Sequence, residues 1–514
     1  MMRKLWNVRP SNRLLEDKLV DELKITRVVA RILINRRITD PDDVRGFLNG
    51  GLPDLFDPFL LKDMERAVSR IREAMDKREK VLIYGDYDVD GITSVALLKK
   101  VLDGLGADSI TYIPNRLEEG YGLNSEAVAD ANRKDVKLII TADCGSDALD
   151  EVRVANSLGI DVIITDHHEI KSDKIPPAYA IINPHQSDCS YPFKYLAGVG
   201  IVYKLAQALT RKKFCNLEQH LDLVALGTVA DVAPQISENR IFTKCGMRAL
   251  SRTEHAGLGA LISVSGLKDK EISVGHIGYI LGPRINAMGR TGSPDVALKL
   301  LLTGNRLEAD NIAGLLNKEN KTRQKIESRI LEQALSRIEK EVNFKEHLIL
   351  VVAQEGWHSG VIGIVASRIQ ERFYRPTVMI ALEGDTGKGS GRSIENFNLF
   401  AALKHSSEHL TDFGGHESAC GLSIHRDKVD AFRDSINAYA RGCISDTDLL
   451  PKINIDMEIP FADLTEGLVK DLDLLSPYGP GNPRPVFVSS QVAVKDRPRL
   501  LGKNGYKMWL ESGN

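Results

Sequence analysis

VLIYGDYDVDGI, residues 81–92, is the stretch that decides the fold of this chain. Its first four residues are mostly apolar and branched, which predicts a short buried strand, and from Ile92 the apolar residues follow a helical period. Asp86, Asp88 and Asp90 therefore follow the carboxyl end of a strand, where open α/β sheets bind their ligands. Three carboxylates this close repel one another unless a cation lies among them.

Two other interpretations of this acidic stretch are a solvated turn and a calcium loop. A solvated acidic turn is the common explanation of an isolated D-x-D pair. A calcium loop of the EF-hand type also begins with D-x-D-x-D-G, but it requires a glutamate at its twelfth position. Counting from Asp86, that position is Leu97, and a strand rather than a helix precedes the loop. The EF-hand is therefore excluded.

The composition is that of a globular protein with several domains, since 514 residues exceed one ordinary core. The formal net charge is −2, so any surface for nucleic acid must carry its positive charge locally. The six cysteines are scattered without a C-x-x-C pair, which favours reduced thiols in the cytoplasm. No signal peptide and no apolar stretch of about 20 residues is visible, so we expect no membrane association.

Alternating strands and helices follow an N-terminal helical region over residues 1–75 and predict an α/β fold with a parallel, doubly wound sheet. Strands are expected at residues 81–84, 109–113, 137–141 and 161–165. The third leads into Asp143 and the fourth into Asp166, His167 and His168, while Asp231 follows an apolar run over residues 221–226. Parallel strands end at one edge of a sheet, so these side chains should converge.

Each of these residues alone has an ordinary explanation: Asp143 or Asp231 as a helix cap, the two histidines as loop residues. A zincin motif is excluded, because Ser172 stands where the second histidine belongs. The combination of acids and paired histidines in one βαβ unit instead predicts a site for Mn²⁺ or Mg²⁺. Six or seven ligands are more than one ion needs, which predicts two ions of the kind that assist phosphoryl transfer.

The order of D-x-D-x-D-G, T-A-D-C-G, D-H-H and G-T-V-A-D along the chain resembles the DHH phosphoesterase superfamily. Within it, the chain is similar over nearly its whole length to bacterial exonucleases specific for single-stranded DNA. The resemblance implies two-metal hydrolysis from the 5′ end, releasing 5′-mononucleotides in DNA recombination and repair. The catalytic residues it implies are Asp86, Asp88, Asp90, Asp143, His167, His168 and Asp231. We expect Asp86 to lie behind the others, and the remaining six are the implied metal ligands.

The same resemblance implies a set of substrate-binding residues. Arg116, Ser390 and Arg392 match positions that grip a 5′-phosphate, as guanidinium groups do well. Tyr121 is expected to stack on a terminal base. The other implied residues are Arg284, Asn286 and Arg290 along the substrate path, with His358 and His416 near the scissile phosphate.

The domain layout implied is a DHH domain over residues 76–302, a connecting helix over 303–344 and a DHHA1 domain over 345–445. Within the DHHA1 domain, residues 387–393 are expected to form a flexible basic loop. Cys420 stands where the family more often has a small apolar residue, and we interpret this as a packing change of little functional weight. Residues 452–514 are expected to form an incomplete OB-like domain of antiparallel strands, because the sequence ends before a five-stranded barrel could close.

The OB-like segment also combines basic and aromatic residues. Residues 495–507 carry five basic residues and one acidic residue, with Tyr506 and Trp509 close by. Such a combination holds single strands in OB-folds, although a basic rim with core aromatics would look the same. The partners implied by resemblance are single-stranded DNA, a RecQ-type helicase and a single-strand-binding protein, and we expect a monomer.

Two other functions remain open at this point. One is a DHH phosphodiesterase acting on oligoribonucleotides or cyclic dinucleotides, against which the chain length and the OB-like tail argue. The other is an inactive DHH scaffold of a replication complex, against which the full set of acids and histidines argues.

Overall fold

The structure is a computed structural model that describes residues 4–115, 119–120, 122–170, 175–210, 216–291, 293–502 and 505–512. It divides into two compact units. One contains residues 8–317 and 454–514, and the other contains residues 1–7 and 318–453.

A five-stranded parallel sheet forms the centre of the first unit, with strand order β3-β2-β4-β5-β6. The four predicted strands are confirmed, and β6 is an additional short strand that the sequence did not predict. The strands are β2 (Lys80–Gly85), β3 (Ser109–Tyr112), β4 (Val136–Ala142), β5 (Asp161–Thr165) and β6 (Ala180–Ile182).

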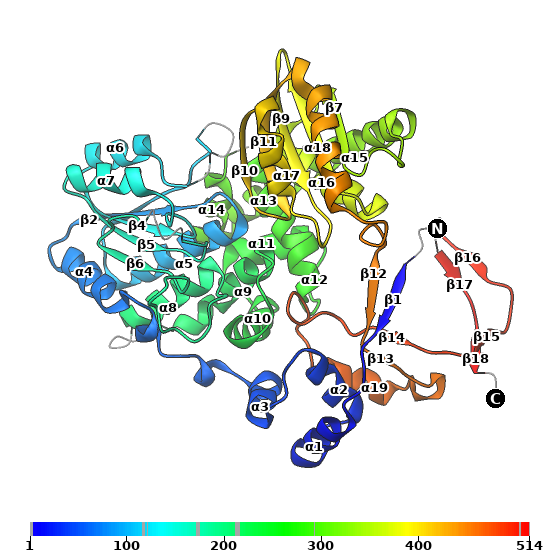
Figure 1. The fold of residues 1–514 in the computed structure, drawn as a ribbon. Helices are drawn as coiled ribbons and strands as arrows, with labels where there is room; N and C mark the ends of the chain where they lie inside the picture. The colour runs from blue at the N-terminus through cyan, green and yellow to red at the C-terminus, as the bar shows by residue number, and fades with distance from the viewer. Residues whose placement is uncertain are drawn as a thin grey trace. The chain divides into compact units, whose positions relative to one another are not determined.

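Helices cover both faces of this sheet (Figure 1). One face packs against α4 (Met64–Asp76), α5 (Val89–Leu105) and α8 (Gly198–Thr210). The other packs against α6 (Ser125–Arg133) and α7 (Leu149–Ser157). Consecutive residues of β2 alternate between the two cores, which is why the strand reads as a continuous apolar run. The predicted doubly wound α/β fold is confirmed.

The apolar run that precedes Asp231 lies in a helix, α9 (Leu221–Ala230), all but the last residue of which is buried. A helix that is apolar on every side can only lie in the interior of a unit. Asp231 therefore stands at the carboxyl end of a helix, whereas Asp143 and the two histidines follow strands.

The N-terminal region is largely helical, as predicted. It contains α1 (Arg13–Leu23), α2 (Arg27–Asn35) and α3 (Pro41–Asn49), after a short strand β1 (Leu5–Val8) that was not predicted. Asp40 caps α3 by accepting a hydrogen bond from the Asp42 amide, and Pro41 opens the helix.

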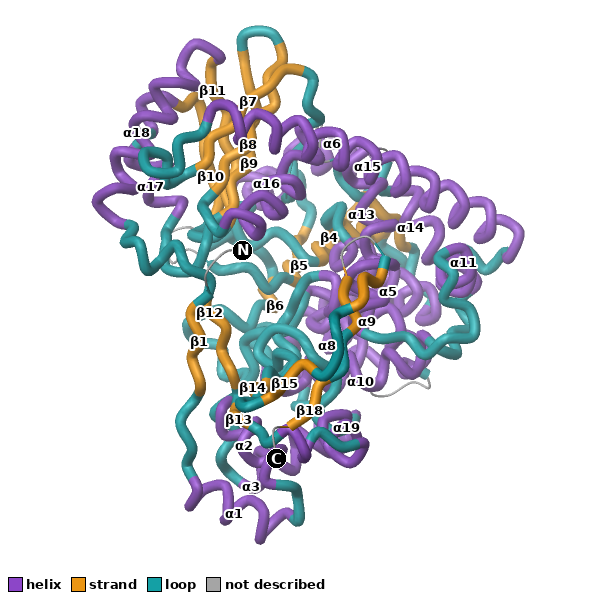
Figure 2. The backbone as a smooth tube through the Cα atoms, turned by 90° about the vertical axis from the view of Figure 1, so that its right-hand side faces the viewer, coloured by secondary structure: helices purple, strands orange, loops and turns teal. Residues whose placement is uncertain are grey.

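The second unit contains a five-stranded mixed sheet with strand order β10-β11-β9-β8-β7. The long helix α15 (Arg306–Glu341) leads into it, and its part in this unit packs with α16 (Ser359–Phe373) on one face. Helices α17 (Leu399–His405) and α18 (Val429–Cys443) cover the other face (Figure 2). The strands are β7 (Leu350–Glu355), β8 (Thr377–Glu383), β9 (Thr386–Arg392), β10 (Leu410–Gly415) and β11 (Ala419–His425).

The expectation of a flexible loop at residues 387–393 is wrong, because residues up to Arg392 belong to β9, the central strand of this sheet. Its three glycines alternate with polar residues, so they share one face of the strand. A Cβ on Gly389 would lie 2.7 Å from Leu422, and one on Gly391 would lie 2.7 Å from Leu399. The glycines are therefore required by the close approach of side chains from α17 and from the neighbouring strand β11.

The described part of the C-terminal residues 454–514 contains helix α19 (Glu466–Asp473) and several short paired strands. β15 (Val492–Val494) pairs with β18 (Leu510–Ser512), and β16 (Arg499–Leu501) pairs with β17 (Gly505–Lys507), both antiparallel. β13 (Met457–Glu458) and β14 (Phe487–Val488) pair in parallel, so the prediction of antiparallel strands is wrong for this pair. Among the described residues, no helix has the length and apolar character needed to cross a bilayer.

Candidate metal centre

Seven acidic and imidazole side chains meet at the carboxyl edge of the parallel sheet. They form three overlapping groups, within each of which the ligand atoms lie within 4.8 Å of one another. Carboxylate oxygens and imidazole nitrogens are a donor set that suits Mn²⁺, and Mg²⁺ when water completes its shell. The groups are Asp143, His167 and His168; Asp90, His167 and Asp231; and Asp86, Asp88 and Asp143.

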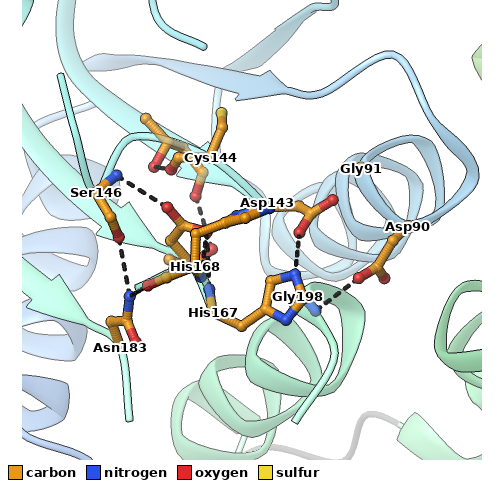
Figure 3. Close-up of polar contacts among 12 residues, drawn as sticks. Asp90, Gly91, Asp143, Cys144, Ser146, His167, His168, Asn183 and Gly198 are labelled. Atoms are coloured by element: carbon orange, nitrogen blue, oxygen red, sulfur yellow. Dashed lines mark hydrogen bonds and ion pairs between the residues drawn. The ribbon is translucent and has the colours of Figure 1, made fainter. Parts of the chain in front are cut away.

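The first-motif acids are held where β2 turns into α5. Asp88 caps α5 by accepting a hydrogen bond from the Gly91 amide at 3.0 Å. The buried Asp90 reaches the amino end of α8, where its two oxygens accept hydrogen bonds from Gly198 at 2.7 Å and Val199 at 2.9 Å (Figure 3). The positive end of a helix dipole favours an anion at this position.

Asp143 follows β4 in a left-handed backbone conformation, with φ of 66°. Aspartate tolerates this conformation better than most residues. The turn directs its Oδ1 toward His167, whose Nε2 lies 3.1 Å away (Figure 3). Gly198 lies so close that a Cβ there would be 2.4 Å from the same oxygen.

The histidines are fixed by Asp166, a buried residue that the sequence analysis placed at this edge of the sheet without assigning it a role in the site. Its Oδ1 accepts hydrogen bonds from the amides of His167 at 2.8 Å and His168 at 3.2 Å, and lies 2.7 Å from His168 Nδ1. Its Oδ2 accepts from the Ser146 amide at 2.9 Å. A proton on His168 Nδ1 leaves Nε2 as the ligand atom, a common arrangement behind metal-bound histidines.

The backbone around His168 is held by Asn183, a residue that the sequence analysis missed. Asn183 is fully buried at the end of β6. Its side-chain amide donates to Ser146 Oγ and to the His168 carbonyl, each at 2.9 Å (Figure 3). Asp166 was visible in the sequence as a strand-end acid, whereas no local pattern identifies Asn183.

Asp231 completes the cluster from the end of α9. Its Oδ2 lies 3.9 Å from His167 Nε2, and its side chain is 26% exposed. The pairing places His167 between Asp143 and Asp231, two acids that are far apart in the sequence.

Burial of so many like charges changes their protonation. Burial, Asp231 and Asp88 raise the pKa of Asp90 to about 7, against the effect of His167. Burial and Asp88 raise the pKa of Asp231 to about 6, again opposed by His167. Burial lowers the pKa of His168, but the hydrogen bond to Asp166 and the negative charges of Asp166 and Asp143 together outweigh it and raise the pKa to about 9. The metal-free cluster therefore retains protons that a cation would displace.

These shifts predict the pH dependence of stability. An acid with a raised pKa in the folded state, such as Asp90, costs stability as pH rises from its ordinary value of 3.8 to about 7. A histidine with a raised pKa, such as His168, loses its stabilising contribution as pH rises from 6.5 to about 9. The metal-free protein should therefore melt at lower temperature at about pH 8 than at about pH 5. The rise in melting temperature on adding Mn²⁺ should be larger at the higher pH, because the ligands must lose protons to bind it. Calorimetry at both pH values tests this, and an equal Mn²⁺ effect would contradict it.

Helix α13 (Gly282–Thr291), which carries three predicted substrate-path residues, packs against the first motif. A Cβ on Gly289 would lie 3.0 Å from the Tyr87 carbonyl oxygen. Arg284 donates to the Ile280 carbonyl at 2.6 Å and to Asn317 Oδ1 at 3.2 Å, and burial lowers its pKa. Asn286 is half-buried on the same helix. Arg116 and Tyr121 lie outside the described residues, as does the side chain of Arg290.

In the unit of residues 318–453, the structure brings together Ser390, Arg392 and the first turns of α16. Arg392 Nη1 donates to Ser390 Oγ at 3.2 Å and to the Gly391 carbonyl at 2.7 Å. A Cβ on Gly363 of α16 would lie 2.9 Å from Ser390 Oγ and 3.2 Å from Arg392 Nη2. A guanidinium beside the amino end of a helix is a favourable arrangement for phosphate.

The two predicted histidines of this unit lie at element ends. His358 caps α16, accepting a hydrogen bond from the Gly360 amide at 3.1 Å. His416 follows β10, and its amide donates to the Ala419 carbonyl at 2.9 Å. The Cys420 thiol donates to the His416 carbonyl at 3.0 Å, so Cys420 supports this turn in addition to packing in the core.

Three family models match the chain. They describe the DHH family N-terminal domain at residues 80–228, the DHHA1 domain at residues 346–442 and the RecJ OB domain at residues 455–514. The four motifs of the metal centre fall within or directly after the first match.

Similar proteins cover nearly the whole chain. The single-stranded-DNA-specific exonuclease RecJ of Bacillus subtilis is 38% identical over 97% of this chain, which spans 63% of that relative's length. RecJ of Escherichia coli is 35% identical over 94% of this chain and 86% of its own length.

Solved structures agree with these relatives. RecJ of Thermus thermophilus in complex with Mn²⁺ covers 98% of this chain and 73% of its own length, at 29% identity and a TM-score of 0.85. The same protein has been solved with Mg²⁺, with a TM-score of 0.79. The fold, the order of domains and the sequence identity together show that this chain belongs to the RecJ family of DHH proteins.

Proposed function

We propose that this protein is a metal-dependent exonuclease that degrades single-stranded DNA from its 5′ end and releases 5′-mononucleotides. The observation that carries the proposal is the convergence of seven carboxylate and imidazole side chains at one sheet edge. Membership in the RecJ family supports the substrate class, because relatives of that family are named for action on single-stranded DNA. The proposal extends to a role in DNA recombination and repair.

The chemistry proposed is hydrolysis of a phosphodiester assisted by two divalent ions. Bound Mn²⁺ or Mg²⁺ supplies Lewis-acid stabilisation of the charge that develops on the phosphate oxygens. Asp88, Asp90, Asp143, His167, His168 and Asp231 are the proposed ligands, with Asp86 behind them. Asp166 keeps a proton on Nδ1 of His168, and the amino end of α8 holds Asp90 in place.

End-labelled DNA provides the direct test. Single strands labelled at either end are incubated with and without Mn²⁺ or Mg²⁺, beside matched duplexes, dinucleotides and cyclic dinucleotides. The expected result is metal-dependent release of mononucleotides from the 5′ end of the long single strand. Preference for dinucleotides would favour a small-molecule phosphodiesterase, and inactivity with every metal would favour a scaffold.

Replacing Arg392 with alanine should weaken recognition of a 5′-phosphate. We propose that Ser390 and Arg392 bind this group, because the guanidinium and hydroxyl lie together beside the first turns of α16. A charge-assisted phosphate contact of this type contributes about 2 kcal/mol, or roughly 30-fold in affinity. The measurement is the ratio of kcat/KM for 5′-phosphorylated and 5′-hydroxyl strands, which should fall toward one.

Lys388→Ala is the matched control, since it removes an exposed basic residue from the same strand. It should leave the ratio close to that of wild type. An Arg392→Ala protein that still distinguishes the two ends as wild type does would show that the phosphate is bound elsewhere.

The remaining parts of the proposal concern location and partners. The five cysteines among the described residues are free thiols, which is consistent with a reducing cytoplasm. A RecQ-type helicase and a single-strand-binding protein are proposed partners, and the protein is proposed to act as a monomer. In the C-terminal segment, Lys507 Nζ lies 5.3 Å from the centre of the exposed Trp509 ring, a basic–aromatic pairing suited to a single strand.

A further inference from the structure

Helix α9 ends beside the metal centre in a turn that normally requires glycine. The Val232 amide donates to the Val229 carbonyl at 3.2 Å, and the Ala233 amide donates to the Thr228 carbonyl at 3.2 Å. These two bonds define a Schellman motif, in which the residue after the cap adopts the left-handed conformation. That residue is Val232, with φ of 62°.

Valine is an unfavourable residue for this position. Its branched Cβ crowds the backbone in the left-handed region, where a β-branched residue is a true outlier. Its side chain is also 64% exposed, so burial in the core does not compensate for the strain. Asp143 has a similar φ, but aspartate adopts it readily. Strain of this kind persists where the surrounding structure enforces it, and it clusters at functional sites.

The surroundings hold Val232 at the rim of the metal centre. Asp231, one residue earlier, lies 3.9 Å from His167 Nε2, and Ala233, one residue later, is buried. On the other side, a Cβ on Gly282 would lie 3.5 Å from Ala230 and 3.9 Å from Val89, so the start of α13 packs between the end of α9 and the first motif. The backbone on both sides of Val232 is thus anchored, and its isopropyl group is exposed to solvent at the position that directly follows Asp231.

We propose that Val232 is a substrate-contacting residue whose isopropyl group packs against the sugar and base of the nucleotide bound at the metal centre. This assignment rests on the proposed function. A nucleotide presents both a charged phosphate and the apolar surface of its deoxyribose and base. The seven acids and imidazoles can serve only the phosphate through cations, and Val232 supplies an exposed apolar side chain one residue after Asp231.

Three substitutions separate the contact from the strain. Val232→Gly and Val232→Asn both suit the left-handed turn and remove the isopropyl group, whereas Val232→Ile keeps an apolar branched side chain. The glycine variant should raise the melting temperature by about 2 °C. Both the glycine and asparagine variants should raise KM for single-stranded DNA by about 10-fold, since small apolar contacts discriminate at this level. The isoleucine variant should keep KM within about twofold of wild type.

Lys24→Gly is the matched control for the strain. Lys24 ends α1 in the same left-handed conformation, with φ of 56° and its amide bonded to the Val20 carbonyl, and it lies far in the sequence from the four motifs. This variant should gain stability with no change in KM. Mn²⁺ affinity, measured by calorimetry without DNA, should be the same in the Val232 variants as in wild type.

Two results would overturn the assignment of Val232. One is a wild-type KM in both the glycine and asparagine variants. The other is a loss of Mn²⁺ affinity in them, which would show that Val232 acts through Asp231 and not on the substrate. A wild-type protein that leaves single strands intact would instead overturn the proposed function.

Discussion

His167→Ala is expected to lower the rate of mononucleotide release from single-stranded DNA by about 10³-fold or more, equivalent to about 4 kcal/mol of transition-state stabilisation. His167 belongs to two of the three groups of ligand atoms. Its Nε2 lies between Asp143 and Asp231, at 3.1 Å and 3.9 Å from their nearer oxygens. Removing it leaves these acids without the imidazole that offsets their repulsion and takes one ligand from the proposed metal site. Asp143→Ala should have a comparable effect, because Asp143 also belongs to two groups.

The rate should be measured with Mn²⁺ in excess, together with Mn²⁺ affinity and the melting temperature, so that loss of fold is distinguished from loss of metal. His276→Ala is a suitable control, since His276 is also in the unit of residues 8–317 and its side chain only caps the short helix α12 (Val274–His276). A His167→Ala protein that retains a rate within about tenfold of wild type would contradict the proposed metal site.

Gly198→Ala is expected to damage the same site without removing any functional group. The added Cβ would lie 2.4 Å from Asp143 Oδ1 and 2.7 Å from Asp143 Cβ. A carboxylate could rotate away from the first contact, but the second involves an atom fixed to the backbone, so α8 or the turn at Asp143 must move. The shift would also displace the amides of Gly198 and Val199 that hold Asp90. Mn²⁺ affinity and the rate should both fall by about 10- to 100-fold, as for other residues that orient metal ligands.

Gly104→Ala provides the matched control. Gly104 is an exposed residue of α5 with no atom within 4 Å of an added Cβ. The substitution should stabilise the protein by about 0.5–1 kcal/mol and leave the rate unchanged. If Gly198→Ala behaves in the same way, the close approach of α8 to Asp143 is not needed for the site.

The sequence predicted the parallel sheet well because local signals agreed with tertiary structure there. The strands of residues 81–84 and 161–165 are short apolar runs that end at acids, and burial on both faces explains that pattern. The convergence of Asp88, Asp143 and His167 could be predicted because the carboxyl ends of parallel strands lie at one edge of the sheet. The structure brings together all seven predicted residues of the cluster.

What the sequence did not predict depends on contacts between distant segments. The glycine-rich residues 387–393 predicted a loop, but most of them belong to the central strand β9. Glycine is needed there because Leu422 and Leu399 occupy the space that side chains at positions 389 and 391 would require. The role of Gly198 could not be seen without the position of Asp143, which lies far earlier in the sequence. Val232 likewise looks ordinary in the sequence, and only its φ value reveals strain.

The metal centre is assembled from four segments that are translated at different times. The first contributes Asp86 and the last contributes Asp231, at the end of a helix that packs against α5 and α8. A ribosome-bound chain that lacks α9 therefore has the early carboxylates but not the complete set. Only the group of Asp90, His167 and Asp231 needs the end of α9, so an ion bound there would report that the stretch up to residue 231 has been synthesised and folded.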